Sequence, residues 1–253
     1  MLLCIDIGNT NIVVAGIINK KIHFLSRFET NRAYSTRQLG TKLVQLVETN
    51  HKGAVLEDII ISSVVPSLDE VMMEIGKQYF NKIPMFVTPN TKTNLTIKIE
   101  CPSELGSDLL VDGVSAYNKY RCNVIVVDLG TATKFIVVNE NKELLGGAIA
   151  PGVITSLKGL FSSAEKLKEI DLSAPKQVIG NSTITCLESG SIYGTASMLE
   201  GMITRMKEEL PNSKVVITGG IAPLIIPHLR IEFEYDENLL IEGLINIYYK
   251  SYN

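Results

Sequence analysis

The chain has 253 residues, of which 45% are hydrophobic and 20% charged, and this composition excludes a disordered or fibrous protein. Its formal net charge of −3 gives no basic field for nucleic acid or an anionic membrane, so small-molecule partners are favoured. The apolar start is interrupted by Asp6, Asn9 and Asn11, which argues against a signal peptide or a membrane span and favours the cytoplasm.

The first half predicts a meander of strands followed by alternating helices and strands. We expect its strands at residues 2–7, 12–18, 23–28, 58–65, 85–87 and 95–99. Ser35 and Gln38 have the spacing of a capping box and begin an amphipathic helix. Pro66 begins a second helix, and Ser103 is expected to cap a third that reaches about Tyr120.

The second half repeats this meander. A strand is expected at residues 123–128 and continues as a hairpin to residue 138, and further strands are expected at 143–149 and 214–218. Helices are expected from Gly152 to Lys168, at 183–210 and at 237–249. Gly190, Gly194 and Gly201 either weaken the long helix or allow another helix to pack closely. The scattered cysteines form no Cys-x-x-Cys pair and are expected to be reduced thiols.

An Asp-x-Gly turn between two apolar runs occurs twice, at Asp6 and about half the chain later at Asp128. Glycine lets the backbone approach a ligand closely, and the turns carry side chains that can donate to phosphate oxygens: Asn9, Thr10, Asn11, Thr131 and Thr133. An acid beside a phosphate loop indicates a shared cation, usually magnesium for a nucleotide. One copy alone is most often a plain hairpin turn, whereas two copies favour homologous halves that bind nucleotide.

These turns, together with the pair Gly219-Gly220 after a buried strand, resemble the superfold shared by actin, the heat-shock ATPases and sugar and acetate kinases. The resemblance to type III pantothenate kinases is closer and covers nearly the whole chain. It rests on DIGNTN at 6–11, ISSVVPSL at 61–68, ELGSD at 104–108, VVDLGTAT at 126–133, LGGAIAPG at 145–152 and ITGGIAPL at 217–224. It implies an α/β fold of two duplicated actin-like, ribonuclease H-like half-domains, each a mixed sheet with flanking helices, here residues 1–119 and 120–253.

The resemblance also implies a reaction. The γ-phosphoryl group of ATP would be transferred to the primary hydroxyl of pantothenate, giving 4'-phosphopantothenate in the first step of coenzyme A synthesis. This phosphoryl transfer would require magnesium and a monovalent cation, potassium or ammonium. The family works as a homodimer, and neither nucleic acid nor a membrane is expected as a partner.

The site residues implied by the resemblance fall into three groups. ATP would contact Asp6, Ile7, Gly8, Asn9, Thr10, Asn11, Ile12, Val13 and Thr131. Pantothenate would contact Gly106, Ser107, Asp108, Leu109 and Thr183, with Asp108 as the proton acceptor. Asp128 would hold the monovalent cation, and Asp6 would assist magnesium indirectly. Considered alone, Asp108 is simply a first-turn helix acid favoured by the helix dipole.

Several residues depart from the family pattern. Ser107 and Leu109 stand where Ala and Arg are usual, Ile99 stands where many members have a substrate-contacting Tyr, and Lys134 replaces an uncharged hydroxyl residue. The loss of the guanidinium at position 109 removes a grip on the pantothenate carboxylate. Lys134 is either a solvated strand residue or brings positive charge toward the phosphates. Two alternatives stay open: an ATP-binding paralogue with a regulatory role, and a kinase for another small alcohol.

Overall fold

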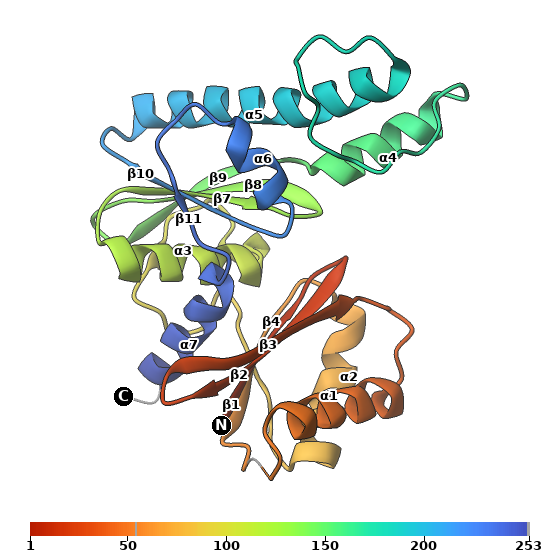
Figure 1. Ribbon diagram of the computed structural model, residues 1–253. Coiled ribbons are helices and arrows are strands. Elements are labelled where there is room, and N and C mark those ends of the chain that lie inside the picture. The colour runs from red at the N-terminus through yellow and green to blue at the C-terminus, as the bar shows by residue number, and fades with distance from the viewer. Residues whose placement is uncertain (54, 252–253) are drawn as a thin grey trace. The chain divides into compact units, whose positions relative to one another are not determined.

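The computed structural model describes residues 1–53 and 55–251, and the chain divides into two compact units (Figure 1). The first unit comprises Met1–Asn118 together with the chain from Asn238 onward, and the second comprises Lys119–Glu237.

Each unit begins with three consecutive strands and continues with helices and further strands. The first contains β1 (Leu2–Ile7), β2 (Asn11–Ile18), β3 (Lys21–Glu29), α1 (Thr36–Asn50), β4 (Asp58–Ser63), α2 (Pro66–Phe80), β5 (Met85–Phe86), β6 (Thr96–Ile97), a 3-10 helix (Pro102–Glu104), most of α3 (Ser107–Tyr120), and α7 (Leu239–Ser251). The second contains β7 (Val124–Leu129), β8 (Ala132–Val138), β9 (Glu143–Pro151), α4 (Val153–Ser163), α5 (Thr183–Glu209), β10 (Lys214–Thr218), α6 (Ala222–Ile225), a 3-10 helix (Ile226–His228) and β11 (Glu234–Tyr235).

One sheet topology occurs in both units. The strand order is β3-β2-β1-β4-β5 in the first unit and β9-β8-β7-β10-β11 in the second. In each unit the three strands of the meander pair antiparallel. The first strand of the meander also pairs parallel with β4 or β10, which in turn pairs parallel with β5 or β11. The predicted α/β class with two duplicated halves is therefore confirmed.

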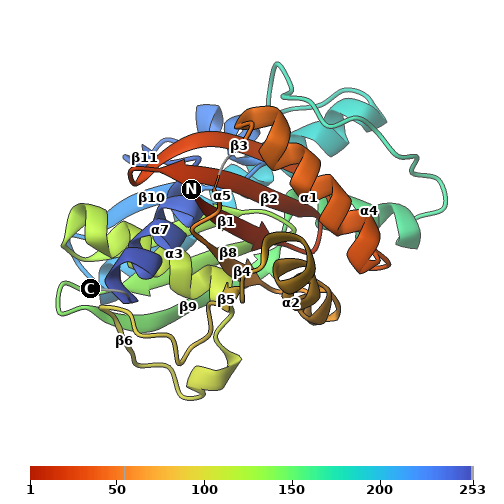
Figure 2. The same ribbon diagram turned by 90° about the horizontal axis from the view of Figure 1, so that it is seen from below.

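Each unit has a hydrophobic core cluster between its sheet and helices. In the first unit, α1 and α2 bury Leu43 and Leu68 against alternate residues of the central strands, such as Ile5 and Ile61. Figure 2 shows α1 and α2 beside the strands of this unit. The predicted capping box is present, because Ser35 and Gln38 each bond the backbone of the other. In the second unit the core includes residues of α4, α5 and α6 packed on Ile125, Val127, Leu129, Val215 and Ile217.

The last helix, α7, belongs to the first unit, whereas the sequence division at residue 119 assigns it to the second half. Its contacts explain the difference. Gly243 lies so close to α3 that an added Cβ would clash with the backbone of Val111. The Tyr248 hydroxyl lies 3.3 Å from Asp58 Oδ2, at the start of β4.

Several local predictions need correction. α3 begins at Ser107 instead of being capped by Ser103, because a 3-10 helix ends at Glu104 and the chain at Leu105 is extended. α4 ends at Ser163, well before Lys168, and the Ser162 hydroxyl bonds back to the Gly159 carbonyl, a local bond that competes with helix propagation. The two-residue strand β11 was not predicted from the sequence.

The long helix α5 is continuous through its three glycines. An added Cβ at Gly190, Gly194 or Gly201 would meet nothing within 4 Å in the described part of the chain. These glycines therefore do not allow close packing of another described helix, and that interpretation is wrong.

The described residues include free cysteines but neither a cluster of possible metal ligands nor a helix that could cross a membrane. The four cysteines are free, as expected, and burial raises the pKa of the Cys4 thiol. Within residues 1–53 and 55–251, no group of three His, Cys, Asp or Glu side chains could hold a metal ion. Over the same ranges, no helix is both long and apolar enough to cross a membrane.

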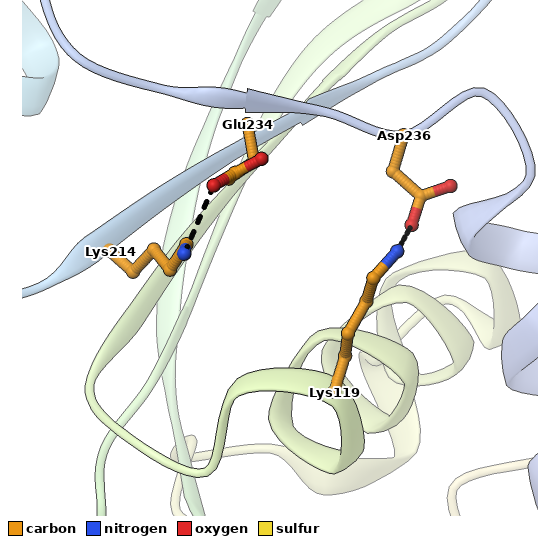
Figure 3. Close-up of polar contacts among 4 residues, drawn as sticks. All are labelled: Lys119, Lys214, Glu234 and Asp236. Carbon is orange, nitrogen blue, oxygen red and sulfur yellow. Dashed lines mark hydrogen bonds and ion pairs between the residues drawn. The ribbon is translucent and has the colours of Figure 1, made fainter.

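Two ion pairs in the second unit differ in burial (Figure 3). Lys119 Nζ lies 2.7 Å from Asp236 Oδ2, and the Asp236 side chain is only 7% exposed. Lys214 Nζ lies 3.2 Å from Glu234 Oε1, and both side chains are more than a third exposed, at 37% and 55%. A buried carboxylate depends on its partner more than an exposed one, since water cannot replace the lost contact.

We therefore expect Lys119→Met to lower the free energy of unfolding by about 1–3 kcal/mol. The matched change Lys214→Met should lower the free energy of unfolding by about 1 kcal/mol or less, because it removes only a surface ion pair and a cation–π contact with Tyr120. Urea unfolding of both variants measures the difference. Equal losses would show that burial of Asp236 does not set the strength of its pair.

Candidate functional site

The first Asp-x-Gly turn joins β1 to β2 and is closed by its own backbone. The Gly8 N–H donates to the Asn11 carbonyl at 3.0 Å. The turn is held from outside by Thr30, whose hydroxyl donates to the Gly8 carbonyl at 2.7 Å. Ile7 and Ile12 are buried, so these two predicted ATP contacts can offer only backbone groups, whereas Asn9 and Thr10 are exposed at the tip.

The second turn joins β7 to β8 and is braced by the start of α4. The Gly130 N–H donates to the Ala132 carbonyl, while the Thr131 carbonyl accepts from the Gly152 N–H at 3.1 Å and the Thr155 hydroxyl at 2.6 Å. The Thr131 side chain is exposed and accessible to a ligand. Thr133 is only 1% exposed, so its hydroxyl does not point from an open turn to a phosphate as the sequence suggested.

The two acids occupy equivalent positions in their sheets. Asp6 pairs with Ser62 on the parallel strand β4, and Asp128 pairs with Thr218 on the parallel strand β10. Each acid thus lies at the carboxyl end of a central strand, beside a buried hydroxyl residue of the next strand. This edge of an open α/β sheet is where ligands usually bind.

The antiparallel neighbours of the two acids differ. Asp6 lies opposite Val13, whereas Asp128 lies opposite Lys134. The Lys134 ammonium is 2.5 Å from Asp128 Oδ2, and both side chains are largely buried. The charged lysine is therefore an internal partner of the acid and not a solvated strand residue.

The predicted substrate segment begins α3 and is fixed to the end of β4. The Ser107 hydroxyl accepts from the Ser63 N–H and donates to the Ser63 carbonyl, both at 3.0 Å, and lies 3.1 Å from the Ser62 hydroxyl. Asp108 is 8% exposed, and one of its carboxylate oxygens accepts from the Leu109 N–H. Ser107 therefore sets the position of the first turn of α3, which carries Asp108.

The end of β4 thereby connects two predicted groups of site residues. Ser62 is the parallel neighbour of Asp6 on one side and contacts Ser107 on the other. The first phosphate turn and the substrate segment are thus held at one end of the first unit's sheet. Asp128, Thr131 and Thr183 belong to the second unit.

A cavity of about 500 Å³ opens beside the same segment in the first unit. Its lining includes Ser63, Asp69, Phe86, Gly106 and Ser107. The volume lies in the range of small-molecule sites. Among the described residues that line it, none is Lys, Arg or His. In the second unit, Thr183 borders a separate pocket at the start of α5.

Two residues beside the first turn were missed by the sequence analysis. Arg32 Nη2 donates to Asn9 Oδ1 at 2.7 Å, which places a guanidinium against the predicted phosphate segment. Asp69 accepts a 2.5 Å hydrogen bond from the Ser63 hydroxyl at the cavity wall. Neither residue is part of a recognisable motif, because both reach the site through the fold and not through sequence spacing.

Comparisons with known proteins match most or all of the chain. A sequence model of the type III pantothenate kinase family matches residues 2–205. The type III pantothenate kinase of Geotalea uraniireducens (strain Rf4) is 38% identical over 253 residues, covering 99% of both chains.

Solved structures with the same fold share much less sequence. A Baf family transcriptional activator from Campylobacter jejuni has a TM-score of 0.60 and 21% identity, with 99% of both chains covered. An inorganic polyphosphate/ATP-glucomannokinase from Arthrobacter sp. strain KM has a TM-score of 0.52 and 15% identity over 98% of both chains. These two likenesses show the fold alone and confirm the predicted superfold. The matches in sequence go further, and the chain belongs to the type III pantothenate kinase family.

Proposed function

We propose that this protein uses ATP to phosphorylate pantothenate on its primary hydroxyl. The observation that carries the proposal is the end of β4, where Ser62 lies between Asp6 of the phosphate turn and Ser107 of the substrate segment. A phosphoryl-transfer site must hold a phosphate turn and a candidate base at a fixed spacing, because catalysis here is mainly positioning and charge neutralisation.

The phosphate-binding roles fit the residues of the first turn. The backbone of residues 6–13 and the exposed amide of Asn9 would hold phosphate oxygens, and Arg32 would add positive charge. Thr131 would make a further ATP contact from the second turn. The donor set also fits magnesium, since this ion is usually held by one or two carboxylates together with phosphates and water rather than by a protein cage. Asp6 would hold it indirectly, and magnesium would neutralise charge on the phosphates.

Asp108 is the candidate base for the substrate hydroxyl. It is buried in the first turn of α3, beside the Gly106 and Ser107 wall of the cavity. There it would accept the proton as the hydroxyl attacks phosphorus. Gly106 also has a packing role, because an added Cβ would lie 2.5 Å from Asp108 Oδ1.

The acceptor site that we propose is the cavity beside this segment. Its apolar lining, including Val64, Phe86 and Leu105, suits the aliphatic part of pantothenate. The acids Asp69 and Glu70 at its wall would repel a carboxylate. We infer that the pantothenate carboxylate points away from these acids, since Leu109 replaces the usual Arg and offers no cation to hold it. Thr183, at a separate pocket of the second unit, stays a candidate contact that the resemblance implies.

The monovalent cation that the resemblance assigns to Asp128 does not fit the residues present. The Lys134 ammonium already lies on this carboxylate. We therefore include ATP and magnesium in the proposed reaction and derive no step from potassium or ammonium.

We also propose a homodimer in the cytoplasm. Large apolar side chains are exposed on α4, on the segment after it and at the start of α5, namely Ile154, Leu160, Val178, Ile179 and Ile184. Figure 1 shows α4 and this segment extending beyond the strands of the second unit. Exposed apolar surface of this kind is typical of a subunit interface. The free cysteines agree with a reducing compartment.

The first test is ADP release by the purified protein with ATP and magnesium, with and without pantothenate. We expect a clear pantothenate-dependent rate, and mass spectrometry should find 4'-phosphopantothenate. Parallel reactions with small sugars control for a different alcohol acceptor. Confirmed ATP binding without any pantothenate-dependent release would contradict the proposed function.

A second prediction concerns Asp108. We expect Asp108→Asn to lower turnover by about a hundredfold to ten-thousandfold, the usual contribution of a general base, with little change in ATP affinity. Glu104→Gln removes an exposed acid four positions earlier and should leave both quantities unchanged. Steady-state kinetics and nucleotide titration measure the two effects. Near-normal turnover of Asp108→Asn would remove this residue as the base.

A third prediction concerns the dimer. Ile179 is 82% exposed in the single chain, and Ile179→Glu should convert the dimer to a monomer, because a buried unpaired charge is costly. Ile83→Glu makes the same change at a site in the first unit that is 71% exposed and should leave the dimer intact. Light scattering gives the mass of each. A dimer that survives Ile179→Glu would place the interface elsewhere.

A further inference from the structure

The carboxylate of Asp128 is enclosed by two features of its own unit. Lys134 Nζ contacts Oδ2 at 2.5 Å, with the Lys134 and Asp128 side chains 16% and 13% exposed. On the other side lies Gly219, whose φ of +100° favours glycine, and an added Cβ there would lie 2.6 Å from Oδ1. The acid is therefore held between an ammonium group and backbone, with little contact with water.

The sheet register makes this ion pair part of the fold. Asp128 and Lys134 are directly opposed on β7 and β8, so their side chains project from the same face. The first turn is longer by one residue, and there the residue opposite the acid is Val13. Only the second of these two turns therefore places a cation from its own hairpin on its acid.

An acid at this position needs a compensating charge. Asp128 is the penultimate residue of β7, close to the turn that carries Thr131, the proposed ATP contact. An uncompensated carboxylate would repel the phosphates, and its burial without a partner would be unfavourable. A bound monovalent cation is one solution, and an ammonium group supplied by the chain is another.

The two solutions compete for one oxygen atom of the carboxylate, Oδ2. A potassium ion could approach Oδ2 only by displacing the Lys134 ammonium, and a largely buried ion pair would then be lost. Lys134 is covalently part of the hairpin, so it contacts Asp128 without the loss of translational freedom that a dissolved ion suffers on binding. The internal ion pair should therefore prevail at ordinary salt concentrations.

We propose that Lys134 is a positioning residue whose ammonium group replaces the monovalent cation at Asp128. The nucleotide site of this protein is then independent of potassium and ammonium. For catalysis the inference rests on the proposed kinase function, but for nucleotide binding it requires only the ATP site.

The test compares potassium, ammonium, sodium and choline chloride at one ionic strength. ATP affinity is measured by calorimetry with magnesium present, and turnover is measured by ADP release. For the unmodified protein we expect both quantities to vary by less than about twofold among the salts, because Lys134 already supplies the positive charge at Asp128. A twofold change is well below a tenfold change, which corresponds to about 1.4 kcal/mol. Loss of tenfold or more in sodium or choline would overturn the proposal without any variant.

Lys134→Ala should bind ATP at least tenfold more weakly in choline and regain most of the loss in potassium or ammonium, which can then enter the vacated space. Lys134→Arg retains a cation and should stay independent of the salt. Lys214→Ala removes an equally charged lysine from an ion pair on the neighbouring strand β10 and should behave as the unmodified protein.

The possible outcomes distinguish failure of the proposed Lys134 role from a folding defect and from failure of the kinase function. A folded Lys134→Ala protein that binds ATP normally in every salt would overturn the proposal, as would one that no cation restores. Thermal melting of each variant identifies a folding defect, and the unmodified protein still decides the question in that case. If pantothenate never stimulates ADP release while the ATP affinities follow the expected pattern, the kinase function fails and the role of Lys134 stands.

Discussion

The parallel pairing of the two central strands in each unit is the constraint on which the candidate site depends. It places Asp6 beside Ser62 and Asp128 beside Thr218. In β1 and β7 every residue except the acid is buried, so each strand is open to a ligand at its acid near the carboxyl end. In the first unit the Ser107 hydroxyl also bonds the backbone at the end of β4, and these bonds fix the first turn of α3. The position of Asp108 is thus a consequence of strand pairing and one buried hydroxyl.

Ser107 has a structural role that the family pattern alone did not indicate. As a departure from the usual Ala of the family, it suggested altered contact with the substrate. In the structure its hydroxyl makes bonds to both backbone groups of Ser63, so it has a clear structural role even though it also borders the cavity. Net gains from such bonds are about 1 kcal/mol each, which is enough to favour one placement of a helix end. The substitution therefore adds rigidity where the candidate base must be held.

Local sequence patterns predicted much of the fold, whereas they predicted only part of the candidate site. Alternating and continuous apolar runs predicted the strands of both meanders, and the capping box correctly gave the start of α1. Sequence could not assign α7 to the first unit, because the close approach of Gly243 to α3 is a tertiary contact. It likewise could not show Arg32 against Asn9, since that contact depends on how the chain returns after β3.

The partner of Asp128 shows most clearly why sequence alone was insufficient. The sequence placed Lys134 after the turn but left its direction open, because a slip of one residue in a hairpin moves a side chain to the opposite face. The observed register puts it directly opposite the acid. In the first turn one extra residue puts Val13 there instead. The duplicated hairpin therefore has different electrostatics in its two copies because of one residue type, since the position opposite the acid is apolar in the first copy and is a lysine in the second. Charge compensation by a tethered ammonium group follows from that register and needs no ion from solution.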